Sequence, residues 1–141
     1  MAARSEWRIL LALWLMVFSA SSQVVIMAPI LPRIGATLGI AEVEQGSLIT
    51  AYAVMLSVMA LVAGPVSDRL GRRVILLAGS GAMTGALLLH GVAYSFAALL
   101  AVRALAGAAG GLLSGAAVSY VGDYFPYERR GWANGWVMSG I

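Results

Sequence analysis

The sequence has no cysteine, no lysine and a single histidine, and it has few charged residues of any kind. The lack of cysteine excludes disulfides and thiolate metal sites, and one histidine, His90, excludes a metal site built from clustered histidines of this chain. Charged residues make up 11% of the 141 residues, whereas soluble domains have about a quarter. So few charges cannot cover a surface that faces water, and the composition therefore predicts a membrane protein.

Hydrophobic residues make up 61% of the chain and form runs long enough to cross a bilayer, which takes about 20 residues per helix. Four spans are predicted, over 9–30, 48–66, 74–94 and 97–121, and a fifth begins near 132. The predicted fold class is an all-α membrane protein. Because the sequence ends within the fifth span, we expect these residues to be the N-terminal part of a longer protein.

The first span could also be a signal peptide, since Arg4 and Arg8 precede it. Its apolar run is longer than the core of a signal peptide, and no pair of small residues marks a cleavage site at 29–32. We therefore expect the first span to remain part of the membrane protein.

The remaining arginines predict the orientation of the chain. Arg69, Arg72 and Arg73 lie between the second and third spans, and Arg129 and Arg130 follow the fourth. They fall on the same side as the N-terminus, and the other side has only Arg33. Cytoplasmic loops carry an excess of Arg and Lys, so we expect the N-terminus and loop 67–73 on the cytoplasmic side. The expected location is the plasma (inner) membrane, which the chain crosses several times. Short basic joints without a basic face argue against nucleic acid as a partner.

Glycines occur four residues apart in two of the spans. The third span has Gly81 and Gly85, and the fourth has Gly111 and Gly115. Small residues at this spacing let helix backbones approach closely in membranes. We therefore expect both pairs to lie at contacts between helices.

The densest cluster of charges, residues 64–77, reads GPVSDRLGRRVILL. An excess of arginine on the cytoplasmic side explains the arginines but not Asp68 or the glycines. Gly64 and Gly71 are expected to flank a tight turn, where glycine permits special backbone angles.

This stretch resembles the signature loop of the major facilitator superfamily, whose pattern is G-x-x-x-D-R/K-x-G-R-R/K. Every fixed position of the pattern is matched, by Gly64, Asp68, Arg69, Gly71, Arg72 and Arg73. MAPILPRIGATLGI after the first span, RALAGAAGG in the fourth and DYFPYERRGWANG after it also resemble segments of the family. The resemblance covers the whole chain and implies the first four to five helices of a twelve- or fourteen-helix major facilitator fold.

The resemblance also implies a role for the loop as a gate. In the family, this loop holds the two six-helix halves together on the cytoplasmic side when the transporter faces outward. Carried over, Asp68 lies at a helix N-terminus of the other half, where partial positive charge favours a carboxylate. Arg72 is then expected to form an ion pair with Asp123 at the end of the fourth span.

One charge is predicted to lie inside the membrane. Arg103 is six residues into the fourth span, at a depth of about 9 Å. Because a charge is costly there, such residues usually face a cavity or a partner. Arg103, Gly107, Gly110 and Ser114 share one helical stripe, which we expect to line a water-filled cavity. In the family this arginine faces the cavity and, in proton-coupled members, is linked to proton exchange; the alternative is that it extends to the outer headgroups.

The first span contributes Ser19, Ser22 and Gln23 on one face, and we expect all three to line the solute cavity. Gln23 lies at about the depth of Arg103, so we expect both to approach the same solute site. The alternative for Gln23 is a hydrogen bond between helices. Tyr52 in the second span is another candidate for the cavity wall, with simple packing as its alternative, and His90 is expected at the membrane interface.

The resemblance implies a secondary transporter that moves a small solute by alternating access, with proton-coupled export of drugs or metabolites (antiport, multidrug efflux) as the favoured form. Its partners would be the solute, protons, the lipid bilayer and the C-terminal half of the same transporter. No acidic residue lies within the four spans, although many proton-coupled exporters of the family have one.

Three other functions are weighed against export. An uptake symporter for a sugar or organic anion would pair Arg103 with an anionic group. A truncated, non-transporting membrane scaffold belongs to a different class. A small four-helix exporter would need a glutamate within span 9–30, which has none. The sequence offers no nucleophile–base pair or metal constellation, so neither an enzyme nor a cofactor is predicted.

Overall fold

The computed structural model describes residues 2–141, with side chains from Ser5 onward, so that of Arg4 lies outside the described part. Within that range the chain forms five helices: α1 (Ala2–Leu38), α2 (Glu42–Leu70), α3 (Arg72–His90), α4 (Phe96–Tyr124) and α5 (Tyr127–Met138). Four of them, α1 to α4, are long and apolar enough to cross a membrane. The predicted all-α membrane fold is therefore confirmed.

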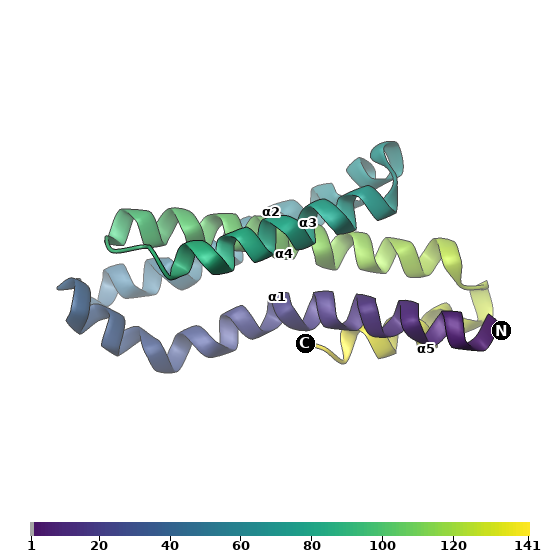
Figure 1. The fold of residues 1–141 in the computed structure, drawn as a ribbon, viewed down its shortest axis with the longest axis horizontal. Coiled ribbons are helices and arrows are strands. Elements are labelled where there is room, and N and C mark those ends of the chain that lie inside the picture. Colours follow the sequence, from purple (N-terminus) through teal and green to yellow (C-terminus); the bar gives the residue numbers. More distant parts are fainter. Residues whose placement is uncertain (1) are drawn as a thin grey trace.

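The ends of the helices differ from the predicted spans. Helix α1 continues past residue 30 to Leu38, with Pro29 and Pro32 inside it. Proline removes one backbone hydrogen bond and bends a helix without necessarily ending it, and α1 bends along its second half (Figure 1). Helix α3 ends at His90 instead of 94. Helix α4 starts after the Ser95 cap, whose hydroxyl accepts a hydrogen bond from the backbone N–H of Ala98 at 3.2 Å.

Helix α4 is the centre of the bundle. It packs against α2, α3, α1 and α5, and half of its most apolar stretch is buried, against 17–28% in the other three long helices. Its inward residues, among them Leu113, Ala117 and Val121, form one core with Leu10, Leu13 and Val17 of α1 and with residues of the other helices. The outer faces carry exposed apolar side chains, as expected of helices that contact lipid.

The glycine pairs behave differently from each other. A methyl group at Gly111 or Gly115 would run into the backbone of α2, so these two glycines allow α2 and α4 to approach closely, as predicted. Within the described residues, a methyl group at Gly81 or Gly85 would meet nothing within 4 Å. The prediction that Gly81 and Gly85 lie at a helix contact is therefore wrong for this part of the chain.

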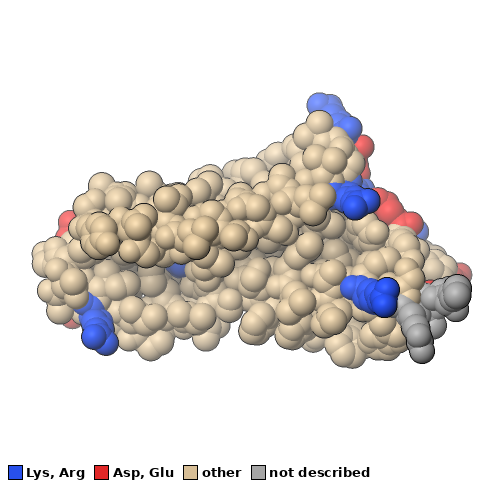
Figure 2. Space-filling view, viewed as in Figure 1, with Lys and Arg blue, Asp and Glu red and all other residues tan. Residues whose placement is uncertain are grey.

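The helices run alternately up and down, which gives the bundle two different ends. The start of α1, the α2–α3 turn and the α4–α5 turn lie at one end, and the α1–α2 and α3–α4 links lie at the other (Figure 1). We call the first the arginine-rich end; its arginines are Arg8, Arg69, Arg72, Arg73, Arg129 and Arg130. On the face drawn in Figure 2, most charged side chains gather at this end, and the middle is almost wholly uncharged.

Candidate functional site

The α2–α3 turn at the arginine-rich end is a single residue, Gly71. Its φ of +93° lies in the region that favours glycine, so another residue would be strained there. Gly64 was expected to flank the turn as well, but it lies inside α2, where its carbonyl oxygen accepts hydrogen bonds from Ser67 and Arg72. The role of Gly64 here is therefore as a backbone acceptor, and the prediction of a turn at this residue is wrong.

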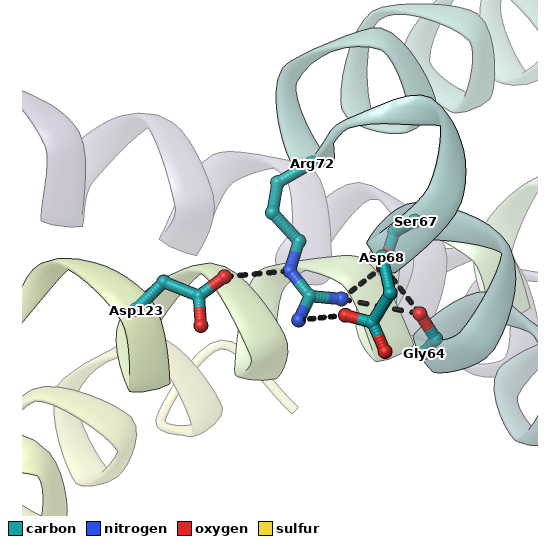
Figure 3. A network of polar contacts seen from close by, with 5 residues as sticks. All are labelled: Gly64, Ser67, Asp68, Arg72 and Asp123. Atoms are coloured by element: carbon teal, nitrogen blue, oxygen red, sulfur yellow. Dashed lines mark hydrogen bonds and ion pairs between the residues drawn. The ribbon is translucent and has the colours of Figure 1, made fainter.

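Arg72, the first residue of α3, connects three helices (Figure 3). Its Nε donates to Oδ2 of Asp123 in α4 at 2.8 Å, and its Nη1 donates to the carbonyl oxygen of Gly64 in α2 at 3.1 Å and to Ser67 Oγ. Nη2 forms an ion pair with Asp68. We call this group the Arg72 cluster: Gly64, Ser67, Asp68, Arg72 and Asp123.

The exposure of the Arg72 cluster makes it a weak connection. The side chain of Arg72 is 19% exposed, but those of Asp68 and Asp123 are 59% and 61% exposed. Ion pairs with exposed partners contribute about 0–1 kcal/mol each. The pair between Arg72 and Asp123 that the resemblance implies is present, while Arg69 and Arg73 are exposed and form no ion pair within the described residues.

A second connection at the arginine-rich end joins α1 to α5, and no pattern in the sequence predicts it. Arg129 Nη1 lies 3.0 Å from Glu6 Oε2, and its guanidinium lies 5.2 Å from the centre of the Trp132 ring. The Trp7 ring is nearly perpendicular to those of Trp132 and Trp136, with ring centres 5.6 and 5.3 Å apart. The sequence shows these aromatic residues but not which helices lie next to each other, so pattern alone could not pair them.

Arg103 of α4 is enclosed between α1 and α2. Only 1% of the surface of Arg103 is exposed. Nε donates to the carbonyl oxygen of Leu48 in α2 at 3.3 Å, and Nη1 donates to that of Gln23 in α1 at 3.1 Å. The guanidinium lies 4.5 Å from the centre of the Tyr52 ring. So closely enclosed a side chain cannot extend to the lipid headgroups, and it has no ion-pair partner within the described residues.

Arg103 lies at one edge of a cavity of about 670 Å³ between α1, α3 and α4, toward the end opposite the arginines. We call it the Arg103 cavity; it is lined by Gln23, Ile26, Met27, Ile30, Ile34, Thr37, Leu38, Leu87, His90, Ala93, Tyr94, Leu99 and Arg103. Figure 2 shows a hollow between the α1 layer and the helices above it. The structure thus brings Gln23 and Arg103 together at one cavity, and the binding of a solute there stays a prediction.

The other residues expected to line a cavity with Arg103 do not line this one. A methyl group at Gly107 would overlap the Tyr52 backbone, and one at Gly110 would meet the Tyr52 hydroxyl, so the stripe below Arg103 packs against α2 and α1. Tyr52 is fully buried, and its hydroxyl donates to the Ala20 carbonyl oxygen at 2.5 Å. Ser114 is half-buried and lies outside the Arg103 cavity. A helical wheel gives the direction of a residue but not the neighbour it meets.

The two serines of α1 are separated from Gln23. Ser19 lines a second hollow of about 340 Å³, with Ser80 and Thr84 of α3, and Ser22 lines neither hollow. Both hydroxyls donate to carbonyl oxygens of their own helix, Ser19 to Met16 at 2.8 Å and Ser22 to Ser19 at 3.0 Å. The expectation that the three residues act on one site is therefore wrong for Ser19 and Ser22 in this structure.

His90 was expected at the interface, but it lines the Arg103 cavity. Its Nδ1 lies 2.7 Å from the carbonyl oxygen of Ala86. The sequence signal was a lone histidine at the end of an apolar span, which does not distinguish a cavity from an interface. Within the described residues, no group of three or more metal-ligating side chains comes together.

Comparison with known proteins gives a consistent family match. The sequence model of the Major Facilitator Superfamily matches residues 13–141. The multidrug resistance protein MdtG of Proteus mirabilis is 31% identical over 132 residues, which cover 90% of this chain and 33% of that protein. The gallate transporter of Pseudomonas putida is 33% identical over 132 residues, which cover 91% of this chain and 28% of that protein.

A further relative is an uncharacterized MFS-type transporter, YceJ, of Bacillus subtilis. It is 32% identical over 98 residues, which cover 67% of this chain and 25% of that protein. The chain thus spans between a quarter and a third of the length of these three relatives.

Proposed function

Because the chain belongs to the Major Facilitator Superfamily, we propose that it forms the N-terminal part of a secondary transporter that moves a small solute by alternating access. The observation that carries the proposal is the buried Arg103 at the edge of a cavity, since a charge kept inside a membrane is costly and usually serves a transport path. The other half of the transporter would supply the second wall of the path.

We further propose that the arginine-rich end faces the cytoplasm of the plasma (inner) membrane. Basic residues favour the cytoplasmic side, and this end holds all the described arginines except Arg33 and Arg103. The Arg72 cluster would then be an inner clasp, with Arg69 and Arg73 as its exposed neighbours. Its weak ion pairs suit a contact that opens in every transport cycle.

Proton-coupled export of a drug or metabolite is the favoured form of this function. The similarity to proteins named for multidrug resistance supports export. Uptake of an organic anion is the second candidate, supported by the similarity to a gallate transporter and by the absence of an acidic partner for Arg103 within the described residues. The membrane scaffold without transport activity is the alternative of another class.

The test is solute-driven proton flux in inverted membrane vesicles, followed with a dye that reports the pH difference. Vesicles with the full-length protein are energised, and three candidate solutes are then added in turn: an organic cation, an aromatic acid and a sugar. Export by antiport predicts that one of them releases protons from the vesicles in a saturable manner. Vesicles with the 141-residue chain alone should show none, and saturable flux by that chain would contradict the proposed need for a second half.

Arg103→Ala is expected to lower this flux at least about tenfold, because the cavity would lose its only buried cation within the described residues. Membrane insertion and folding should be largely kept, since the change removes two hydrogen bonds and one contact with the Tyr52 ring but leaves the glycine contacts of α4 intact. Arg33→Ala is the matched control, because Arg33 lies at the opposite end and has no ion pair in the described chain. Normal flux in Arg103→Ala would show that Arg103 has only a structural role.

A further inference from the structure

One side of α5 changes in chemistry along its length, starting from the arginine-rich end. Arg129 is followed by Trp132, Gly135, Trp136 and the capping residue Ser139, and the helical spacing places these five residues on one side of the helix. All five are exposed. Ten residues of helix rise about 15 Å, so this side leads from a cation to an uncharged aromatic surface. We call these five residues the α5 face.

The α5 face holds a hollow of about 420 Å³, lined by Trp132, Gly135, Trp136 and Ser139. Gly135 leaves this space open, because it has no side chain and a methyl group there would meet nothing within 4 Å in the described chain. None of the four lining side chains is ionisable. The two indole rings offer apolar surface to a hydrocarbon chain, and tryptophan is enriched where the hydrocarbon of a membrane meets water.

Arg129 retains hydrogen-bond donors for a ligand. Its Nη1 lies 3.0 Å from Oε2 of Glu6, which uses one of the five N–H groups of the guanidinium. The other N–H groups form no hydrogen bond within the described residues. The Arg129 side chain is 47% exposed, and its guanidinium lies 5.2 Å from the centre of the Trp132 ring. Phosphate oxygens can bind such a guanidinium in pairs, so this end of the α5 face suits a phosphate.

The arginine-rich end as a whole attracts anions. Its six arginines outnumber the carboxylates at the same end, of which the described residues contain four: Glu6, Asp68, Asp123 and Glu128. The pair of Arg129 and Glu6 is itself neutral, so the attraction to a further negative charge comes from the end as a whole. Clustered basic residues at a membrane surface favour anionic lipids over neutral ones.

We propose that the α5 face binds an anionic phospholipid from the leaflet at the arginine-rich end. The phosphate accepts hydrogen bonds from Arg129, the glycerol lies beside Trp132, and one acyl chain occupies the hollow at Gly135. The groups along the α5 face thus follow the order of the groups along the lipid, from phosphate to hydrocarbon. This hollow shares no lining residue with the Arg103 cavity, and the inference goes beyond the proposed transport function.

The experiment locates the lipid by photochemical cross-linking. The full-length protein is placed in nanodiscs of phosphatidylcholine with a small share of phosphatidylglycerol that carries a diazirine on one acyl chain. After illumination, mass spectrometry identifies the cross-linked residues, which should gather at 132–139. Unlabelled phosphatidylglycerol should suppress these cross-links about fivefold better than unlabelled phosphatidylcholine, as expected for one extra lipid charge near basic residues.

Two variants test the two ends of the site. Arg129→Gln removes the cation, Gly135→Leu fills the hollow, and each should lower cross-linking at 132–139 severalfold. Arg33→Gln and Gly46→Leu are the matched controls, because both positions lie at the opposite end of the bundle. Arg33 has no ion pair in the described chain, and a methyl group at Gly46 would meet nothing there within 4 Å. Both controls should be cross-linked like the unchanged protein.

The unchanged protein can overturn the inference even if a variant fails to fold. Equal suppression by the two unlabelled lipids would do so, as would cross-links spread evenly over the exposed helices. Absence of cross-links at 132–139 would also overturn it and would indicate that another part of the full-length chain covers the α5 face. In a folded Gly135→Leu, unchanged cross-linking would show that the hollow holds no acyl chain. None of these results depends on whether the protein transports a solute.

Discussion

Asp68→Asn is expected to abolish solute-driven proton flux while leaving the protein inserted in the membrane. The Asp68 side chain is 59% exposed and contacts Arg72 across the turn at Gly71, so its charge contributes little to the stability of this part. In the proposed clasp, its exposed carboxylate meets a helix N-terminus of the other half, where an anion is favoured. Asparagine has nearly the same shape but no charge, and it would weaken this contact.

The measurement compares flux in inverted vesicles with the amount of inserted protein in the same preparation. Glu128→Gln is the matched control, because Glu128 is an exposed acid at the same end with no ion pair in the described chain. Glu128→Gln should transport normally. Flux at the unchanged rate in Asp68→Asn would argue against the clasp.

Gly111→Ala is expected to destabilise the protein more than a change to alanine at a glycine outside the contact between α2 and α4. A methyl group at Gly111 would overlap the Leu56 carbonyl oxygen and lie 2.8 Å from the Ala60 backbone nitrogen. Backbone atoms of a packed helix cannot turn aside as a flexible side chain can. The cost should lie at the upper end of the range for overpacked cores, about 1–3 kcal/mol.

Thermal unfolding of the purified full-length protein in detergent checks this prediction. Gly122→Ala, also in α4, is the matched control, because a methyl group there meets nothing within 4 Å in the described chain. Alanine is the better helix former, so Gly122→Ala should unfold at the same temperature or a higher one. Equal unfolding temperatures for the two variants would mean that α2 and α4 are not in close contact.

Most of the fold could be predicted from the sequence, because apolar runs and arginine positions depend on the bilayer and not on which helices are neighbours. The ends of the helices could not. Whether a helix continues through Pro29 and Pro32 depends on tertiary contacts, and the start of α4 depends on a single hydroxyl, that of Ser95. The ion pair between Arg72 and Asp123 could be predicted only because residues 64–77 resemble the signature loop of the family.

The cavity was harder to predict than the charged turn. The position of Arg103 in a long apolar run was enough to expect a special environment, and Gln23 was placed beside it by depth alone. Gly107 and Tyr52 were assigned to the wall, but they meet each other, because the close approach of α2 to α4 cannot be read from either helix by itself. His90 joins the cavity because α3 packs against α4 while α1 lines the other side, an arrangement that no local pattern contains.

The most direct test of a clasped, alternating transporter introduces one cysteine into these 141 residues, which contain none. Thr37 lines the Arg103 cavity, so a cysteine is placed there by Thr37→Cys. Its reaction with an impermeant maleimide added to intact cells reports whether the cavity is open to the outside. The full-length protein should be labelled from outside, and Asp68→Asn should slow labelling severalfold by shifting the population toward the inward-open state. Labelling only after lysis, or at the same rate with and without Asp68→Asn, would contradict the account.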